Sequence, residues 1–250
     1  MKTGIVSITF RNKSIDEVIA LAADNGLSAI EVGSDVHAPR TDLAECRRVA
    51  ELAAKAGVVI ASYGSYYRLG QGEDFMEYVA AAKALGAGNI RVWAGAKGSA
   101  DTTENEWQTL VADAKRCAEA VAREGMTLSF EYHGGTLTDT AETALRLMRS
   151  VDHPSVYLYW QPNQYRDLDF NVTALRAVLP YVSHIHVFAW TTAEKKIVRH
   201  PLAAHENAWR QYLDILASDG RERCLLLEFV KDDAADQLAA DAQTLKNWVR

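Results

Sequence analysis

Residues 127–161 read TLSFEYHGGTLTDTAETALRLMRSVDHPSVYLYWQ and contain the pattern that decides the fold. An alternating strand pattern over Thr127–His133 is followed by an amphipathic helical pattern over Thr140–Ser150. A second strand pattern then covers Val156–Gln161. A strand, a helix and a strand in this order form the unit of a parallel sheet, because a parallel connection needs a long crossover.

The same unit repeats along the whole chain. The predicted strands cover Gly4–Phe10, Ala29–Gly33, Val58–Ser62, Asn89–Trp93, Thr127–His133, Val156–Gln161, Ser183–Trp190 and Cys224–Val230. The predicted helices cover Ser14–Asn25, Asp42–Ala56, Asp74–Ala84, Asn105–Glu124, Thr140–Ser150, Asn171–Leu179, Ala204–Ala217 and Ala234–Val249. Eight such units in 250 residues match a (β/α)8 barrel, which runs to about 250 residues. An open doubly wound sheet is the alternative, but no glycine-rich phosphate motif follows the first strand. We therefore predict a single (β/α)8 TIM barrel domain over residues 1–250.

Charge and cysteine content exclude several classes of partner. The chain carries 27 basic and 33 acidic side chains, a formal net charge of −6, whereas proteins that bind the phosphate backbone present a basic surface. Cys46, Cys117 and Cys224 show no CxxC spacing and are expected to be reduced. No run approaches the roughly 18 apolar residues of a membrane span. We therefore expect a cytoplasmic protein with no membrane or nucleic-acid partner.

Barrel geometry indicates where the chemistry lies. Active sites of these barrels lie at the carboxyl ends of the strands, on side chains that point inward. The alternation of strand side chains sends four polar residues inward from four consecutive strands, namely Glu131, Gln161, His186 and Glu228. A buried carboxylate costs several kcal/mol unless it is paired or bound to a metal. The alternative is that each carboxylate pairs with a basic neighbour or lies exposed at the mouth, and that the histidine belongs to the core.

Two carboxylates, one imidazole and one amide oxygen form a mixed nitrogen and oxygen set. Such a set suits one divalent ion, Mn²⁺, Mg²⁺, Co²⁺ or Zn²⁺. His133 lies two residues beyond Glu131 and is predicted to support the ligands or to contact the substrate.

Other residues near the predicted strand ends are candidates for substrate binding. Trp93 and Tyr66 are predicted to stack on a sugar ring, whereas Trp160 and Trp190 fit the core better. The remaining candidates are polar groups predicted to line the mouth or to bind an anion: His37, Arg68, Arg199, and Lys195 and Lys196, for which a solvated loop is the alternative.

Seven segments in barrel order carry a resemblance to a known family. They are IEVGSDVHAP (30–39), ASYGSYYRLG (61–70), FEYHGG (130–135), YWQPN (159–163), HIHVFAW (184–190), RHPL (199–202) and LLEFV (226–230). Together they resemble the sugar phosphate isomerase/epimerase group of the xylose-isomerase-like barrels. That group includes inosose-metabolism enzymes, ketose 3-epimerases and endonuclease-IV-type nucleases.

The resemblance implies a metal held by Glu131, Gln161, His186 and Glu228. Aspartate is commoner in the family where Gln161 stands, and an amide oxygen binds a cation with one negative charge less. His184 matches the first histidine of the family's HxH motif, which contacts substrate oxygens.

The resemblance also implies an activity. The two glutamates, Glu131 and Glu228, would transfer a proton across a metal-stabilised enediolate of a sugar, sugar phosphate or keto-polyol, and related barrels often form homo-oligomers. We therefore expect an isomerase or epimerase with a small carbohydrate substrate. The alternatives are an inosose-type dehydratase, a metal-free sugar-binding barrel, and an endonuclease-type phosphodiesterase. The phosphodiesterase is disfavoured because it needs more inward histidines and acids and a basic face.

Overall fold

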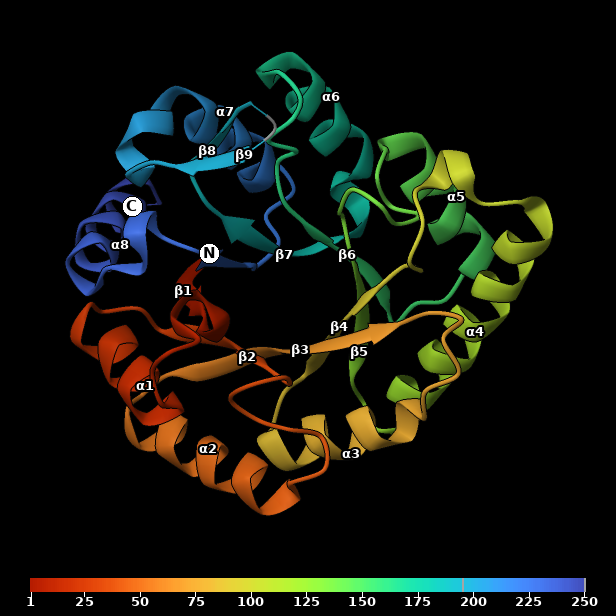
Figure 1. Cartoon of the computed structure of the whole chain (residues 1–250), viewed down its shortest axis with the longest axis horizontal. Helices are drawn as coiled ribbons and strands as arrows, with labels where there is room; N and C mark the ends of the chain where they lie inside the picture. The colour runs from red at the N-terminus through yellow and green to blue at the C-terminus, as the bar shows by residue number, and fades with distance from the viewer. Residues whose placement is uncertain (195, 250) are drawn as a thin grey trace.

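The computed structural model describes residues 1–194 and 196–249 and confirms the predicted barrel (Figure 1). In this described part, eight parallel strands close in the order β1-β10-β7-β6-β5-β4-β3-β2. They are β1 (Lys2–Val6), β2 (Ala29–Gly33), β3 (Val59–Arg68), β4 (Asn89–Trp93), β5 (Thr127–Glu131), β6 (Val156–Trp160), β7 (Val182–Val187) and β10 (Cys224–Leu227). Because all of them run parallel, their carboxyl ends meet at one face of the barrel.

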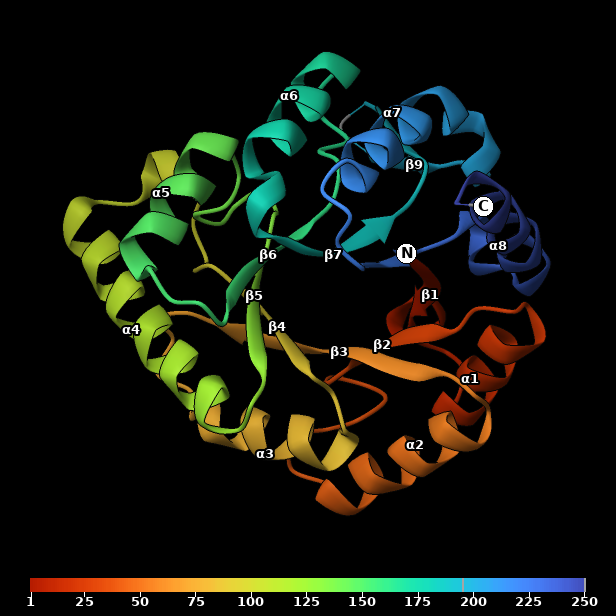
Figure 2. The same cartoon turned by 180° about the vertical axis from the view of Figure 1, so that it is seen from behind.

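A ring of helices surrounds the strands in both views of the molecule (Figures 1 and 2). The α-helices are α1 (Ile15–Asp24), α2 (Leu43–Lys55), α3 (Phe75–Leu85), α4 (Glu104–Arg123), α5 (Ala141–Val151), α6 (Leu168–Val178), α7 (Glu206–Ala217) and α8 (Ala235–Trp248). Short 3-10 helices cover Ser7–Phe10, Ser99–Asp101, Leu179–Tyr181, Leu202–His205 and Lys231–Asp233. The last helix, α8, lies beside α1 and completes the ring. None of the helices in the described residues is long and apolar enough to cross a bilayer.

Local sequence signals set the helix ends. The amide of Glu17 donates to the hydroxyl of Ser14, and the amide of Ser14 donates to the carboxylate of Glu17 at 2.8 Å. This reciprocal pair satisfies two otherwise unpaired donors at the start of α1, as the sequence predicts. At the other end of a helix, Gly86 ends α3 with φ of 74°, a left-handed conformation that glycine adopts without steric cost.

Several predicted strands differ from the structure at their ends. The strand predicted over Val58–Ser62 continues to Arg68 as β3, and two other differences create further elements. The first strand stops at Val6, and the residues up to Phe10 form a 3-10 helix. The seventh stops at Val187, so the prediction of one strand up to Trp190 is wrong. Trp190 instead starts β8 (Trp190–Ala193), which pairs antiparallel with β9 (Lys196–Arg199) in a hairpin beside α7.

The two faces of each strand have different surroundings. Phe130 and Trp160 point to the helices, and the Trp160 ring packs edge-on against Tyr212 of α7 with centroids 5.1 Å apart. The prediction that Trp160 belongs to the core is therefore confirmed. On the inner face, the hydroxyls of Ser129 and Ser183 hydrogen-bond at 2.8 Å, so the barrel interior is partly polar.

A buried arginine ties the amino-terminal end of the barrel together. Arg223 is 2% exposed and donates to the backbone carbonyls of Val182 and Leu216 at 3.1 and 2.9 Å. It also forms a two-pronged ion pair with Asp219, at 2.7 and 2.6 Å. The guanidinium thereby links the segment before β10 to α7 and β7.

Replacing Arg223 should destabilise the fold without touching the mouth of the barrel. We expect Arg223→Met to lower the free energy of unfolding by about 3 kcal/mol, because carbonyls and a carboxylate lose a charged donor. Urea unfolding at neutral pH measures this loss. Arg221→Met, at a half-exposed arginine two residues earlier, should cost less than about 1 kcal/mol and serves as the control.

The same ion pair predicts a pH dependence. Hydrogen bonds from Arg223 lower the pKa of Asp219 to about 2. A carboxyl with a lowered pKa stabilises the fold above its unfolded pKa of about 4, and this contribution is lost as the pH falls toward 2. The stability difference between Arg223→Met and the unsubstituted protein should therefore narrow in this range. If the stability difference between the two proteins does not change as the pH falls, Arg223 is not the cause of the lowered pKa of Asp219.

Candidate active site

A small cavity of about 240 Å³ lies at the carboxyl ends of the barrel strands. Glu131 ends β5, Gln161 follows β6 and Glu228 follows β10, and all three line this cavity, which we call the mouth. His186 of β7 lies beneath them and is completely buried. The structure thus brings together the four residues that the sequence predicts as a cluster.

His186 is at the centre of this cluster. Its Nδ1 lies 3.1 Å from Oε1 of Gln161. The same nitrogen lies 3.7 Å from Oε1 of Glu131 and 3.6 Å from Oε2 of Glu228. Three oxygens from three strand ends therefore surround one imidazole nitrogen.

Two charged residues that the sequence did not place in the cluster complete it. Arg91 of β4 is 2% exposed, and Glu31 of β2 has no exposed surface. Nε of Arg91 donates to Oε1 of Glu31 at 2.9 Å, and Nη1 of Arg91 contacts Oε2 of Glu131. Nε2 of His186 lies 3.3 Å from Oε2 of Glu31. The sequence signal that singled out Glu131, a charged residue within an apolar strand, is also present at Arg91 and Glu31.

The backbone of β3 approaches this ion pair closely at Gly64. A Cβ atom at this position would lie 2.6 Å from Oε1 of Glu31 and 2.9 Å from Nη2 of Arg91. Ser62, two residues earlier, donates its hydroxyl to Oε2 of Glu31 at 2.9 Å. Gly64 of β3 therefore leaves space for the Glu31–Arg91 ion pair, and Ser62 of the same strand hydrogen-bonds to it.

The buried charges shift one another's pKa values. Burial alone would raise the pKa of Glu31, but the charges of Arg91 and His186 hold it well below its usual range. Burial alone would lower the pKa of Arg91, but the carboxylates of Glu131 and Glu31 raise it. Glu31 and Arg91 therefore stay charged although both are buried.

His186 and Glu228 are affected in the same way. Burial opposes charge on His186, but Glu228 and Glu31 outweigh it and raise its pKa. Burial raises the pKa of Glu228, and neighbouring Glu131 adds to this effect against the opposing charge of His186.

Aromatic side chains form the walls of the mouth. Trp93 and His133, two of the residues predicted to contact substrate, both line it, with ring centroids 4.6 Å apart. The guanidinium of Arg68 covers the Trp93 ring at 3.8 Å and does not itself line the mouth. Arg68 therefore supports the wall.

Tyr66 and Phe229 line the same mouth from unusual backbone conformations. Their φ angles are 57° and 45°. A left-handed backbone costs a bulky residue roughly 1–2 kcal/mol, and such strain collects at functional sites. Phe229 directly follows Glu228, so this strain lies next to one of the two carboxyl groups.

Two predicted substrate contacts do not reach the mouth. His184 lies one layer deeper, where its Nδ1 accepts from the amide of Cys224 at 3.2 Å and its ring packs against Tyr159. His37 is buried, with Nδ1 2.9 Å from the hydroxyl of Ser7 and Nε2 3.1 Å from the carbonyl of Lys13. Both predictions are corrected, because these histidines are occupied in holding neighbouring segments together.

The hairpin changes the roles of three further residues. Arg199 pairs with Asp233 at 2.6 Å and does not line the mouth, which corrects its prediction as an anion-binding group. Trp190 lines the mouth and stacks on Phe188 at 3.8 Å, so its assignment to the core is also corrected. Lys196 is exposed on β9, and the prediction for Lys195 lies outside the described residues.

The donor types of the four-residue cluster, two carboxylates, one imidazole and one amide oxygen, are types that bind divalent cations. The oxygen of Gln161 lies 3.1 Å from Nδ1 of His186, near the roughly 3 Å between neighbouring ligands whose bonds to Mg²⁺ are about 2.1 Å long, whereas the oxygens of Glu228 and Glu131 lie 3.6 and 3.7 Å away. Arg91 contacts one oxygen of Glu131 and leaves the other facing the cluster. Across residues 1–194 and 196–249, histidine, cysteine and acidic side chains alone form no group of three placed to hold a metal.

Comparison with known proteins finds a family model and two relatives that resemble this chain in sequence. The family model described as xylose isomerase-like TIM barrel matches residues 19–248. A 3-dehydroshikimate dehydratase from Bacillus anthracis is 27% identical over 207 residues, which cover 74% of this chain and 71% of that protein. An inosose dehydratase from Geobacillus kaustophilus is 38% identical over 58 residues, 23% of this chain and 19% of that protein.

Solved structures show the same fold at low sequence identity. The probable 3-DHS dehydratase of Bacillus anthracis superposes with a TM-score of 0.80 at 22% identity, covering 99% of both chains. A D-psicose 3-epimerase from Clostridium cellulolyticum has a TM-score of 0.75 at 15% identity, covering 100% of this chain and 98% of that one. A Mycobacterium smegmatis barrel in complex with magnesium has a TM-score of 0.75 at 13% identity, covering 99% and 96%.

The close approach at Gly64 can be tested directly. We expect Gly64→Ala to displace Glu31 or Arg91, because its Cβ would lie under 3.0 Å from both side chains. The result should be a loss of about 1–3 kcal/mol in unfolding free energy, measured in urea. Gly88→Ala is the matched control, since a Cβ there meets no atom within 4 Å. Equal stability of the two variants would show that the ion pair tolerates displacement.

Proposed function

The chain belongs to the xylose isomerase-like TIM barrel family, and we propose that it is a dehydratase that removes water from a small hydroxylated ring ketone. One observation carries the proposal. Glu131 and Glu228 line the same small cavity, and each lies within 3.7 Å of the same imidazole nitrogen of His186. Elimination of water next to a carbonyl needs a base for the C–H proton and an acid for the leaving hydroxyl, and two carboxyl groups supply both.

The proposed reaction balances with these two groups alone. One glutamate takes the proton from the carbon next to the carbonyl, and the electron pair of that C–H bond moves toward the carbonyl oxygen. When the pair returns, it forms a carbon–carbon double bond and breaks the C–O bond of the hydroxyl on the next carbon. The other glutamate gives this hydroxyl a proton, and water leaves.

Arg91 supplies positive charge where negative charge develops. It lines the mouth, and its contacts with Glu31 and Glu131 fix the guanidinium before substrate arrives. A fixed charge in a water-poor cavity stabilises a developing oxyanion more than the same charge does in water.

The two similar dehydratases and the cavity support the proposed substrate class. Dehydroshikimate and inosose are both hydroxylated six-membered ring ketones. The mouth has room for one such ring, and Trp93 and Trp190 offer apolar faces to it. An epimerase would share the first proton transfer and return the proton to the other face of the same carbon, so the experiment below separates the two.

The proposal is tested with 3-dehydroshikimate and an inosose in deuterated water. We expect the substrate to lose water, and the absorbance of the new double bond measures this loss. Glu131→Gln and Glu228→Gln should each lower kcat by about 10² to 10⁴-fold, because each removes a proton-transfer group. Glu51→Gln, on the exposed side of α2, is the control and should leave kcat unchanged.

Two results would overturn the dehydratase. Deuterium entering the substrate without loss of water would favour an epimerase. Binding of these ketones without either reaction would favour a sugar-binding barrel.

We further propose that Glu131, Gln161, His186 and Glu228 hold a divalent metal, which when bound would supply a Lewis acid for the carbonyl oxygen. Gln161→Asp adds one negative charge to the set and should tighten Mn²⁺ binding by about tenfold or more, whereas Gln161→Leu should weaken it. Calorimetric titration of the protein with Mn²⁺ alone measures this without turnover. Equal affinities in all three proteins would remove Gln161 from the ligand set.

A further inference from the structure

Glu31 is a buried carboxylate below the mouth that takes no part in the proton transfers of the proposed reaction. It has no exposed surface and does not line the mouth, so a substrate there does not reach it. Nε of Arg91 donates to its Oε1, and the hydroxyl of Ser62 donates to its Oε2, both at 2.9 Å. Glu31 therefore acts through the side chains that it contacts.

Another of these contacts decides where His186 carries its proton. Nε2 of His186 lies 3.3 Å from Oε2 of Glu31. An ionised carboxylate has only acceptor oxygens, and a neutral imidazole has one nitrogen with a proton and one without. The hydrogen between Glu31 and His186 therefore belongs to Nε2. Nδ1 of the neutral ring is left with an unshared electron pair.

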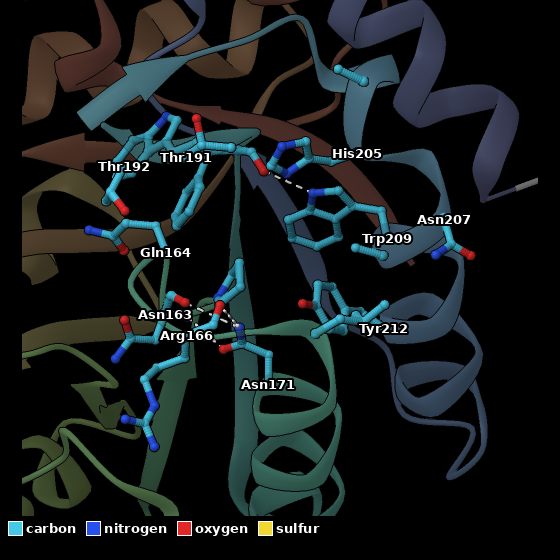
Figure 3. A pocket seen from close by; sticks show the side chains of 16 residues that line it. Asn163, Gln164, Arg166, Asn171, Thr191, Thr192, His205, Asn207, Trp209 and Tyr212 are labelled. Carbon is cyan, nitrogen blue, oxygen red and sulfur yellow. Dashed lines mark hydrogen bonds between the residues drawn. The ribbon is translucent and has the colours of Figure 1, made fainter. Parts of the chain in front are cut away.

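Packing around His186 holds the ring in this orientation. The ring of Tyr159 packs against it with centroids 4.6 Å apart, and the Tyr159 hydroxyl lies 3.2 Å from the hydroxyl of Ser62. The strand end is anchored as well, because the indole of Trp209 in α7 donates to the carbonyl of Phe188 at 2.8 Å (Figure 3). A completely buried ring that is packed in this way keeps Nε2 on the side of Glu31.

The unshared pair of Nδ1 faces oxygens that also present electron pairs. Nε2 of Gln161 donates to Oε1 of Glu131 at 3.4 Å, so the amide turns its own Oε1 toward Nδ1 of His186, 3.1 Å away. Oε2 of Glu228 lies 3.6 Å from the same nitrogen. Positive charge among these atoms, from a cation or a second proton, relieves their mutual repulsion.

We infer that Glu31 is a positioning residue that keeps the proton of neutral His186 on Nε2 and leaves Nδ1 free to bind a cation. A carboxylate that accepts from the second nitrogen of a ligating imidazole also makes the first nitrogen more basic. The consequence for a cation rests on the metal site proposed above, whereas the position of the proton does not.

Nitrogen NMR of the protein labelled in its histidine rings tests the inference without metal or substrate. Signals of His186 are assigned by their loss in His186→Gln. As the pH is raised until the ring carries one proton, Nδ1 should lose its proton and Nε2 should keep it. A neutral ring with its proton on Nδ1 would overturn the inference.

Glu31→Gln should move this proton to Nδ1. Because Nε of Arg91 needs an acceptor, the amide oxygen should take the place of Oε1, and the amide nitrogen would then donate to Nε2 of His186. With Nδ1 protonated, the affinity for Mn²⁺ measured by calorimetry should fall about 10- to 100-fold. A proton that stays on Nε2 in this variant would contradict the role of Glu31.

Ser62→Ala is the matched control, because it removes a hydrogen bond to the same carboxylate oxygen and leaves the carboxylate in place. Arg223→Met controls for a loss of stability away from the mouth. His186 should keep its proton on Nε2 in both, and a proton on Nδ1 in either would overturn the inference.

The two proposals fail separately. If the unsubstituted protein binds no Mn²⁺, the proposed metal site is wrong, and the position of the His186 proton still decides the role of Glu31. If Glu31→Gln does not fold, the spectra of the unsubstituted protein and of Ser62→Ala decide it.

Discussion

The buried guanidinium of Arg91 is the interaction on which the barrel mouth depends. It links Glu31 of β2 to Glu131 of β5 across the inside of the barrel. Removing one partner of such a buried pair leaves an uncompensated charge and typically costs about 3–5 kcal/mol. Because Glu31 also contacts His186, the same pair orients the imidazole around which Gln161 and the carboxyl groups gather. Position and charge in the site therefore come from one network.

Much of this arrangement could be predicted from the sequence because strands impose a strict alternation. Once Glu131 and His186 are assigned to the inward face, their meeting at the carboxyl ends of parallel strands follows from barrel geometry alone. Helix ends could also be predicted from the sequence, because the capping signal of Ser14 and Glu17 lies within four consecutive residues. Such features depend on local pattern and on a closure rule that all these barrels share.

The features that sequence reasoning missed depend on contacts between distant segments. Arg91 and Glu31 are 60 residues apart, and each alone resembles an isolated charge in an apolar strand. His184 shares the inward face of His186, but alternation does not show how deep a residue lies along the barrel axis. Trp190 was assigned to the seventh barrel strand because its antiparallel partner β9 could not be recognised. The exposed residues of β9 give no strong strand pattern.

The β8–β9 hairpin has a consequence for how barrels of this kind diversify. It pairs only with itself among the described strands, yet it gives Trp190 to the wall of the mouth. The carboxyl groups, by contrast, are attached to strands that the whole barrel holds in register. An insertion or exchange in the hairpin would therefore reshape the wall of the mouth while the carboxyl groups of Glu131 and Glu228 stay in place. The shape of the mouth and the position of its carboxyl groups are encoded by segments that evolution can change independently.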